Sequence, residues 1–113
     1  MDLSPVRLDA LFQALGDPTR RALIHRLAAG PATVSDLARP FDMTLPSFLL
    51  HIRKLEASGL VLTSKDGRTR TVTLVPGAFT PVRTWLDDQR DLWEARLDRL
   101  ETFVTDTPKG PRT

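Results

Sequence analysis

Apolar residues in the first half of the chain recur at the three- and four-residue spacings of amphipathic helices. Glycine or proline interrupts the pattern, and the segments between these breaks predict four helices: residues 5–15, 18–29, 34–39 and 45–58. Asp17 and Thr44 stand directly before the second and fourth segments, where a side-chain oxygen can cap a first helical turn. Thr33 or Ser35 can cap the third segment. Gly59 is suited to the position after the fourth helix, because glycine readily adopts a positive φ there.

The pattern changes after Gly59. Residues 60–75 form two extended runs on either side of Asp66-Gly67, and an Asp-Gly pair in that setting predicts a β-hairpin. Residues 80–104 return to helical spacing and predict a long amphipathic helix. A short helix, a tight connection and a capped helix describe a helix-turn-helix, and a hairpin behind it matches the wing of winged-helix domains. The predicted fold class is therefore mainly α with a small β-hairpin, a winged helix-turn-helix.

The fourth predicted helix contains two adjacent leucines, Leu49 and Leu50, and a helix rarely buries both members of such a pair. One apolar stripe is expected to face the core: Leu45, Phe48, Leu49, Ile52 and Leu55. Leu50 falls on the opposite face, which it shares with Ser47, His51 and Lys54. Leu49 therefore has a place in the predicted core, whereas Leu50 does not.

Three stretches of the chain resemble the ArsR/SmtB family of bacterial winged-helix repressors: ALGDPTRRALIHRLAAGPATVSDLA, LPSFLLHIRKLEASGLV and KDGRTRTVTL. The resemblance covers roughly residues 8–104. The segment WLDDQRDLWEARLDRL is similar to a metal-free branch of that family, whose members end in a tryptophan-rich helix. The resemblance implies an operator-binding homodimer that represses its own operon or a neighbouring gene. Where Leu50 stands, the family usually carries a polar or basic residue, so this chain departs from the pattern there.

Positive charge is concentrated in the middle of the chain. Residues 44–75 carry five basic and two acidic side chains, whereas the segments on either side are nearly balanced. Such a local excess indicates a nucleic-acid footprint, and a solvated basic face without a partner is the alternative. The candidate DNA-binding residues on the fourth helix are Thr44, Ser47, Leu50, His51, Arg53 and Lys54. Those on the hairpin, or wing, are Lys65, Arg68 and Arg70.

Each candidate has an expected kind of contact. Arg53 and Lys54 are expected to bind phosphates, which position a protein on DNA without reading its sequence. Leu50 can meet a thymine methyl group in the major groove, and its packing against a partner protein is the alternative. The wing arginines suit the adjacent minor groove or its phosphates.

The terminal helices, about 5–15 and 80–104, carry more apolar surface than a small domain can cover. They are expected to form a homodimer interface through Leu8, Leu11, Phe12, Trp85, Trp93, Leu97, Leu100 and Phe103. A two-fold protein also matches two half-sites on duplex DNA. The alternative is that the aromatic residues only fill the core of a monomer. At 113 residues the chain is expected to form one domain over 1–105, with a disordered tail at 106–113.

Other kinds of chemistry find little support in the sequence. The chain has no cysteine, which excludes disulfides, thiolate metal sites and cysteine nucleophiles. The last predicted helix has acidic residues but no histidine, so neither zinc nor another cofactor is expected, and an oxygen-only metal site is the alternative. These acids interleave with Arg90, Arg96 and Arg99 and are expected to form ion pairs at the surface. His25 and His51 are the only candidate bases near neutral pH, so no enzyme is predicted.

Two further expectations concern partners and location. No apolar run approaches the ~18 residues that span a membrane, and the start, MDLSPVRLDALF, lacks the order of a secretion signal. The sequence therefore predicts a cytoplasmic protein, with a double-stranded DNA operator and a second copy of the chain as partners. No residue identifies a small-molecule effector. A winged-helix module that binds proteins and has lost operator binding is the alternative function.

Overall fold

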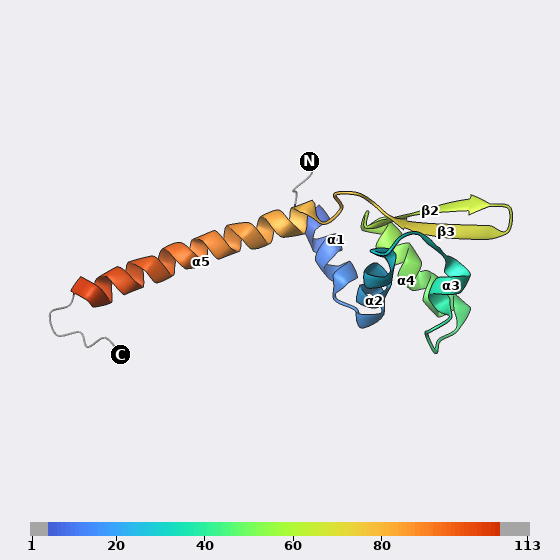
Figure 1. Ribbon diagram of the computed structural model, residues 1–113, viewed down its shortest axis with the longest axis horizontal. Coiled ribbons are helices and arrows are strands. Elements are labelled where there is room, and N and C mark those ends of the chain that lie inside the picture. The colour runs from blue at the N-terminus through green and yellow to red at the C-terminus, as the bar shows by residue number, and fades with distance from the viewer. Residues whose placement is uncertain (1–4, 107–113) are drawn as a thin grey trace. The chain divides into compact units, whose positions relative to one another are not determined.

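The computed structural model describes residues 5–106, and within this range the chain forms five helices and three strands (Figure 1). The helices are α1 (Pro5–Leu15), α2 (Pro18–Leu27), α3 (Val34–Ala38), α4 (Leu45–Ala57) and α5 (Thr80–Asp106). The strands are β1 (Ala32–Thr33), β2 (Val61–Asp66) and β3 (Thr69–Leu74). This order confirms the predicted fold class, a mainly helical winged helix-turn-helix with the hairpin β2–β3 as its wing.

The chain divides after Val82 into two compact units. The described part of the first unit contains α1 to α4, the sheet and the first residues of α5, and that of the second contains the rest of α5. The predicted tail, residues 106–113, lies outside the described residues except for Asp106, which ends α5.

Three helices of the first unit, α2, α3 and α4, begin at side-chain caps. The sequence predicted Asp17 and Thr44, and of the two candidates for α3 the cap is Thr33 and not Ser35. Asp17, Thr33 and Thr44 have extended backbones, and each accepts a hydrogen bond from the backbone N–H three residues later. Gly59 follows α4 with a φ of 85°, which confirms its expected role at the helix end. The core enclosed by these helices and the sheet includes Leu11, Leu23, Phe48, Leu55, Leu60, Val61 and Val72, all with almost no exposed surface.

The wing belongs to a three-stranded antiparallel sheet with the order β1-β3-β2. The two-residue strand β1 was not predicted, because it has no periodicity of its own and leads directly into the cap of α3. It pairs Ala32 with Val72 and thereby attaches the start of α3 to the wing.

The turn of the wing lies one residue later than expected. Asp66 pairs with Thr69, so Gly67 and Arg68 form the two-residue loop. Gly67 has a φ of 63°, and glycine at the first central position is typical of a type II′ hairpin turn. Arg68 is thus placed in the loop itself.

The core stripe of α4 is narrower than predicted. Phe48, Ile52 and Leu55 are buried, whereas Leu49 is half-buried and Leu45 is 56% exposed. Successive helical residues are about 100° apart, which leaves Leu45 and Leu49 at one edge of the stripe. They face the wing there, lining a hollow with Arg68 and Arg70. The prediction that Leu45 and Leu49 lie in the core was therefore wrong. Leu50 is half exposed, as expected for a residue opposite the buried stripe.

Along α5, the large apolar residues are exposed. Trp93, Leu97 and Leu100 each expose more than half of their surface, and Phe103 exposes 71%. Arg90 forms ion pairs with Asp87, Asp91 and Glu94, which confirms surface pairing for that arginine. The helix therefore has an apolar surface beside a charged one.

Candidate nucleic-acid interface

The helix-turn-helix consists of α3, α4 and the connection between them. Thr44 caps α4 and also donates a hydrogen bond from its Oγ1 to the Oγ of Ser47 at 3.0 Å. Ser47, Leu50, Arg53 and Lys54 are all exposed. This set presents hydroxyl groups, one apolar group and two cations on a single helix, which are the groups that bind phosphates, base edges and thymine methyl groups.

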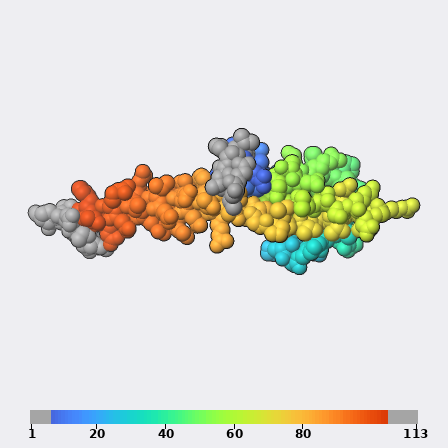
Figure 2. Space-filling model, turned by 90° about the horizontal axis from the view of Figure 1, so that it is seen from above, coloured from blue at the N-terminus to red at the C-terminus, as the bar shows by residue number. Residues whose placement is uncertain are grey.

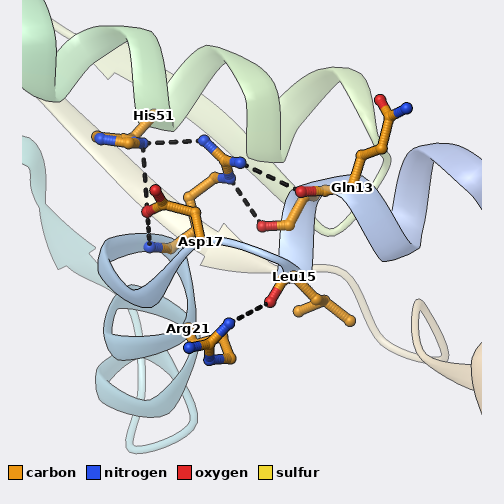
Figure 3. Close-up of polar contacts among 7 residues, drawn as sticks. Gln13, Leu15, Asp17, Arg21 and His51 are labelled. Carbon is orange, nitrogen blue, oxygen red and sulfur yellow. Dashed lines mark hydrogen bonds and ion pairs between the residues drawn. The ribbon is translucent and has the colours of Figure 1, made fainter.

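His51 differs from the other candidates on α4 because its side chain is only 21% exposed. Its Nδ1 lies 3.0 Å from Nη1 of Arg20 at the start of α2 (Figure 3). The Oδ2 atom of Asp17 is 3.7 Å from the same nitrogen. The ring therefore connects α4 to the corner between α1 and α2, and its second nitrogen points away from Arg20 and Asp17 (Figure 3).

Arg20 and Arg21 bind the carbonyl groups at the end of α1, a role that the sequence reasoning did not assign to them. Arg20 donates from Nε to the carbonyl oxygen of Ala14 at 2.7 Å and from Nη2 to that of Gln13 at 3.2 Å. Arg21 donates from Nη1 to the carbonyl oxygen of Leu15 at 2.9 Å (Figure 3). These oxygens belong to the last turn of α1, where carbonyl groups lack the usual helical donor, although that of Gln13 also accepts the backbone N–H of Gly16 at 3.2 Å. Two arginines soon after a helix-ending glycine were the available signal for this contact.

Asp17 completes this corner. Its Oδ2 accepts a hydrogen bond from the backbone N–H of Arg20 at 3.1 Å, the capping bond of α2. Burial by itself raises the pKa of Asp17, but that hydrogen bond and the positive charge of Arg20 outweigh burial. The pKa of this carboxyl therefore lies below its usual value, and the ionised form is the one that the corner stabilises.

The wing carries the second group of candidates. Lys65, Arg68 and Arg70 are exposed, and the tip of the hairpin projects beyond the helices of its unit (Figure 2). Arg70 donates to Thr63 Oγ1 at 3.0 Å, and Thr63 donates to Glu56 of α4 at 2.9 Å. This chain of hydrogen bonds links the wing to α4 and orients the Arg70 guanidinium.

A hollow of about 420 Å³ separates the wing from the helix-turn-helix. Val34, Leu45 and Leu49 contribute apolar groups to it, and Arg68 and Arg70 contribute cations. Thr33, Ser35 and Thr69 complete the lining. A surface of this composition suits a partner that presents both negative charge and apolar groups, as the edge of a DNA groove does.

The residues expected at a dimer interface fall into two groups. Leu11 is completely buried in the core of the first unit, so it has no surface to offer a partner. Leu8 is half-buried and Phe12 is 38% exposed. The five expected residues on α5 all keep at least 40% of their surface exposed: Trp85, Trp93, Leu97, Leu100 and Phe103.

Within residues 5–106, no group of three or more potential metal ligands lies close together. In the same range no helix is both long and apolar enough to cross a membrane.

A capped helix behind a short one, together with a basic hairpin, defines a winged helix-turn-helix DNA-binding protein. A family model described as a helix-turn-helix domain matches residues 15–64. The chain is 39% identical over 79 residues to the HTH-type transcriptional regulator Rv2034 of Mycobacterium tuberculosis, spanning 70% of this chain and 74% of that protein. It is 30% identical over 61 residues to the transcriptional repressor SdpR of Bacillus subtilis, spanning 54% of this chain and 68% of that protein.

Among solved structures, the crystal structure of an ArsR family transcriptional regulator, RHA00566, is 55% identical in sequence and superposes with a TM-score of 0.79. The similarity covers 83% of this chain and 97% of that protein. The chain belongs to the ArsR family of winged helix-turn-helix transcriptional regulators. It is a DNA-binding regulator of transcription and not an enzyme.

Proposed function

We propose that this protein is a homodimeric repressor that binds a specific operator of its own or a neighbouring operon in the cytoplasm, without metal or thiol sensing. The observation that carries the proposal is the joint exposure, in one compact unit, of the outer face of α4 and the basic tip of the wing. The two elements are connected by the hydrogen bonds from Arg70 through Thr63 to Glu56. They can therefore engage one stretch of duplex together.

In this proposal α4 occupies the major groove and the wing reaches the adjacent minor groove or its phosphates. Arg53 and Lys54 neutralise phosphates beside the helix, and Arg68 and Arg70 do so beside the wing. Ser47 and Leu50 face the bases. Because counterions are released from DNA when cations bind, affinity must fall as salt concentration rises.

The proposed dimer forms through α5, with Phe12 of α1 contributing. Support comes from the exposed apolar residues of α5, since apolar patches of this kind usually mark an interface. Two copies bring two α4 helices to two half-sites of an operator. The absence of cysteine from the sequence supports the proposal that the protein does not sense thiols.

A mobility-shift assay tests the DNA-binding part of the proposal. The wild-type protein and the variant Arg68→Ala/Arg70→Ala are titrated against the promoter of the gene and against unrelated duplex, over a series of salt concentrations. The expected result is a specific, salt-sensitive complex whose dependence on salt is smaller in the variant by about two charges. Thr73→Ala, an exposed change elsewhere on β3, is the matched control and should behave as wild type.

Two results would contradict the proposal. If the wild-type protein binds no upstream fragment even at low salt, the exposed face of α4 serves a protein partner instead. If DNA binding depends on added divalent metal, or if metal remains bound through purification and its removal changes affinity, the absence of metal sensing is wrong.

A further inference from the structure

We propose that the two ring nitrogens of His51 have separate functions, with Nδ1 joining α4 to the α1–α2 corner and Nε2–H donating a hydrogen bond to a base in the major groove. The inference rests on the proposed DNA binding and deepens it. It makes Arg20, which does not itself face DNA in this scheme, the residue that positions a base-reading donor.

The first step concerns the contact between Arg20 and His51. Nη1 of Arg20 lies 3.0 Å from Nδ1 of His51, within hydrogen-bonding distance. A guanidinium group can only donate, so Nδ1 must accept and cannot carry the proton. In the neutral ring the proton is then on Nε2, which becomes a donor.

The second step concerns the competing partner of Nδ1. Asp17 Oδ2 is 3.7 Å from this nitrogen, which is too long for a hydrogen bond, and it already accepts the backbone N–H of Arg20 at 3.1 Å. Arg20 is held from two further sides by the carbonyl oxygens of Ala14 and Gln13. The donor to Nδ1 therefore belongs to a side chain with little freedom, which makes it a reliable determinant of the tautomer.

The third step concerns the direction of Nε2. In Figure 3 this nitrogen points away from Arg20 and Asp17. The His51 side chain keeps 21% of its surface exposed. His51 lies one turn after Ser47 and one turn before Lys54 on α4, and both of these residues are exposed. If α4 occupies the major groove, a donor on this side of the helix can reach the hydrogen-bond acceptors there, which are N7 of either purine, O6 of guanine and O4 of thymine.

Two substitutions separate the nitrogens. His51→Asn places an amide oxygen near the position of Nδ1, so it keeps an acceptor for Arg20 and loses the distant donor. His51→Gln places an amide nitrogen near the position of Nε2, so it keeps the donor and loses the acceptor for Arg20. We expect His51→Asn to keep the stability of the wild-type protein and to lose base recognition. We expect His51→Gln to keep base recognition and to be less stable.

The test uses a duplex that the wild-type protein selects from a random library, with each purine replaced in turn by its 7-deaza analogue, which lacks N7. If Nε2 donates to a purine N7, one replacement in each half-site weakens wild-type binding by about fivefold, the worth of one hydrogen bond. His51→Gln keeps this sensitivity. His51→Asn binds the unmodified duplex about fivefold more weakly and loses sensitivity at that position alone. Deaza replacements at the other purines serve as internal controls, since both variants should respond to them as wild type does.

Thymine O4 is tested in the same way with 4-thiothymine, and guanine O6 with 2-aminopurine in place of guanine, so every hydrogen-bond acceptor of the major groove is covered.

Selective ¹⁵N labelling of histidine adds a readout without DNA, in which the NMR shifts of neutral His51 should show the proton on Nε2. In Arg20→Met, which removes the donor to Nδ1, the proton should be shared between the two nitrogens.

The outcomes distinguish this inference from the proposed function. If the library yields no preferred duplex, both fail. If the protein selects a duplex but neither His51 variant alters sensitivity at any modified base, His51 has only a structural role and the inference alone fails. If His51→Asn loses the same amount of affinity for every DNA sequence, His51 contacts a phosphate, and the proposed hydrogen bond to a base is also wrong. A proton on Nδ1 of the free protein overturns the assigned tautomer.

Discussion

At the scale of single residues, the corner between α1 and α2 shows how one short motif satisfies several demands. In the sequence Gly16-Asp17-Pro18-Thr19-Arg20-Arg21, the aspartate caps the start of α2 while the arginines bind the carbonyl groups at the end of α1. The cap was predictable because its partner lies three residues away in the chain. The arginine contacts were not, because they depend on how the chain turns between the helices.

The ionisation of Asp17 should be visible in the stability of the protein. Its pKa is lowered in the folded state, so the carboxylate stabilises the fold above the unfolded-state pKa of about 3.9, and this contribution is lost as pH falls through the folded-state value. Asp17→Asn keeps an amide oxygen as a cap but removes the charge. We expect the variant to be about 0.5–1 kcal/mol less stable than wild type at pH 6, with a smaller difference at pH 2, where more of the carboxyl group is protonated. Urea unfolding at both pH values measures it, and a difference that is undiminished at pH 2 contradicts the electrostatic explanation.

Gly59 provides a second prediction at this scale. Its φ of 85° is unfavourable for other residues, and a Cβ atom there would lie 2.6 Å from Nη2 of Arg7. Gly59→Ala should therefore lower the free energy of unfolding by about 1–2 kcal/mol. Gly16→Ala is the matched control, because Gly16 has no positive φ and its new Cβ would make only ordinary contacts at 3.4 Å. Equal stability of the two variants in thermal unfolding would show that the end of α4 tolerates a side chain.

At the scale of elements, α4 has a buried stripe with two different edges. Leu45 and Leu49 lie on the edge toward the wing, and His51 lies on the edge toward α2. Periodicity correctly assigned Phe48, Ile52 and Leu55 to the core and Leu50 to the outside. It could not decide the edges, since a residue about 100° from the centre of the stripe is buried only if another element covers it.

Leu50 is a half-exposed leucine on the outer face of α4. Leu50→Arg adds a cation to the outer face of α4, so we expect tighter binding to DNA of any sequence and a salt dependence steeper by about one charge. Discrimination between the operator and unrelated duplex should decrease. Fluorescence anisotropy on both duplexes measures these changes, with Leu62→Arg, a change at a more exposed leucine on β2, as the control for charge alone. Unchanged affinity and specificity would mean that residue 50 never reaches the groove.

At the scale of the whole molecule, the exposed apolar surface of α5 is the reason to expect a homodimer. Leu97 and Leu100 are each more than half exposed on a helix of 27 residues. We expect Leu97→Glu/Leu100→Glu to convert a dimer into a monomer in analytical ultracentrifugation, because burying two carboxylates in an interface is unfavourable. Loss of the second half-site contact should weaken operator binding on the order of a hundredfold.

The winged-helix unit itself should stay folded in that variant, since its core residues are all outside α5 or at its first turn. Circular dichroism checks this point, and Leu62→Glu serves as a control with a single leucine-to-glutamate change at an exposed site of the first unit. A wild-type protein that sediments as a monomer, or a double variant that remains dimeric, would place the interface elsewhere.

The sequence by itself determined the features that depend on neighbouring residues in the chain. Helices, caps, the glycine after α4 and the hairpin are local, and their signals lie within a few positions of each other. The tertiary structure alone decided β1, the exposure of Leu45 and the contact between Arg20 and His51. These features depend on contacts between segments up to 40 residues apart, such as the pairing of Ala32 with Val72. A local sequence pattern does not specify which distant segment will pack against it.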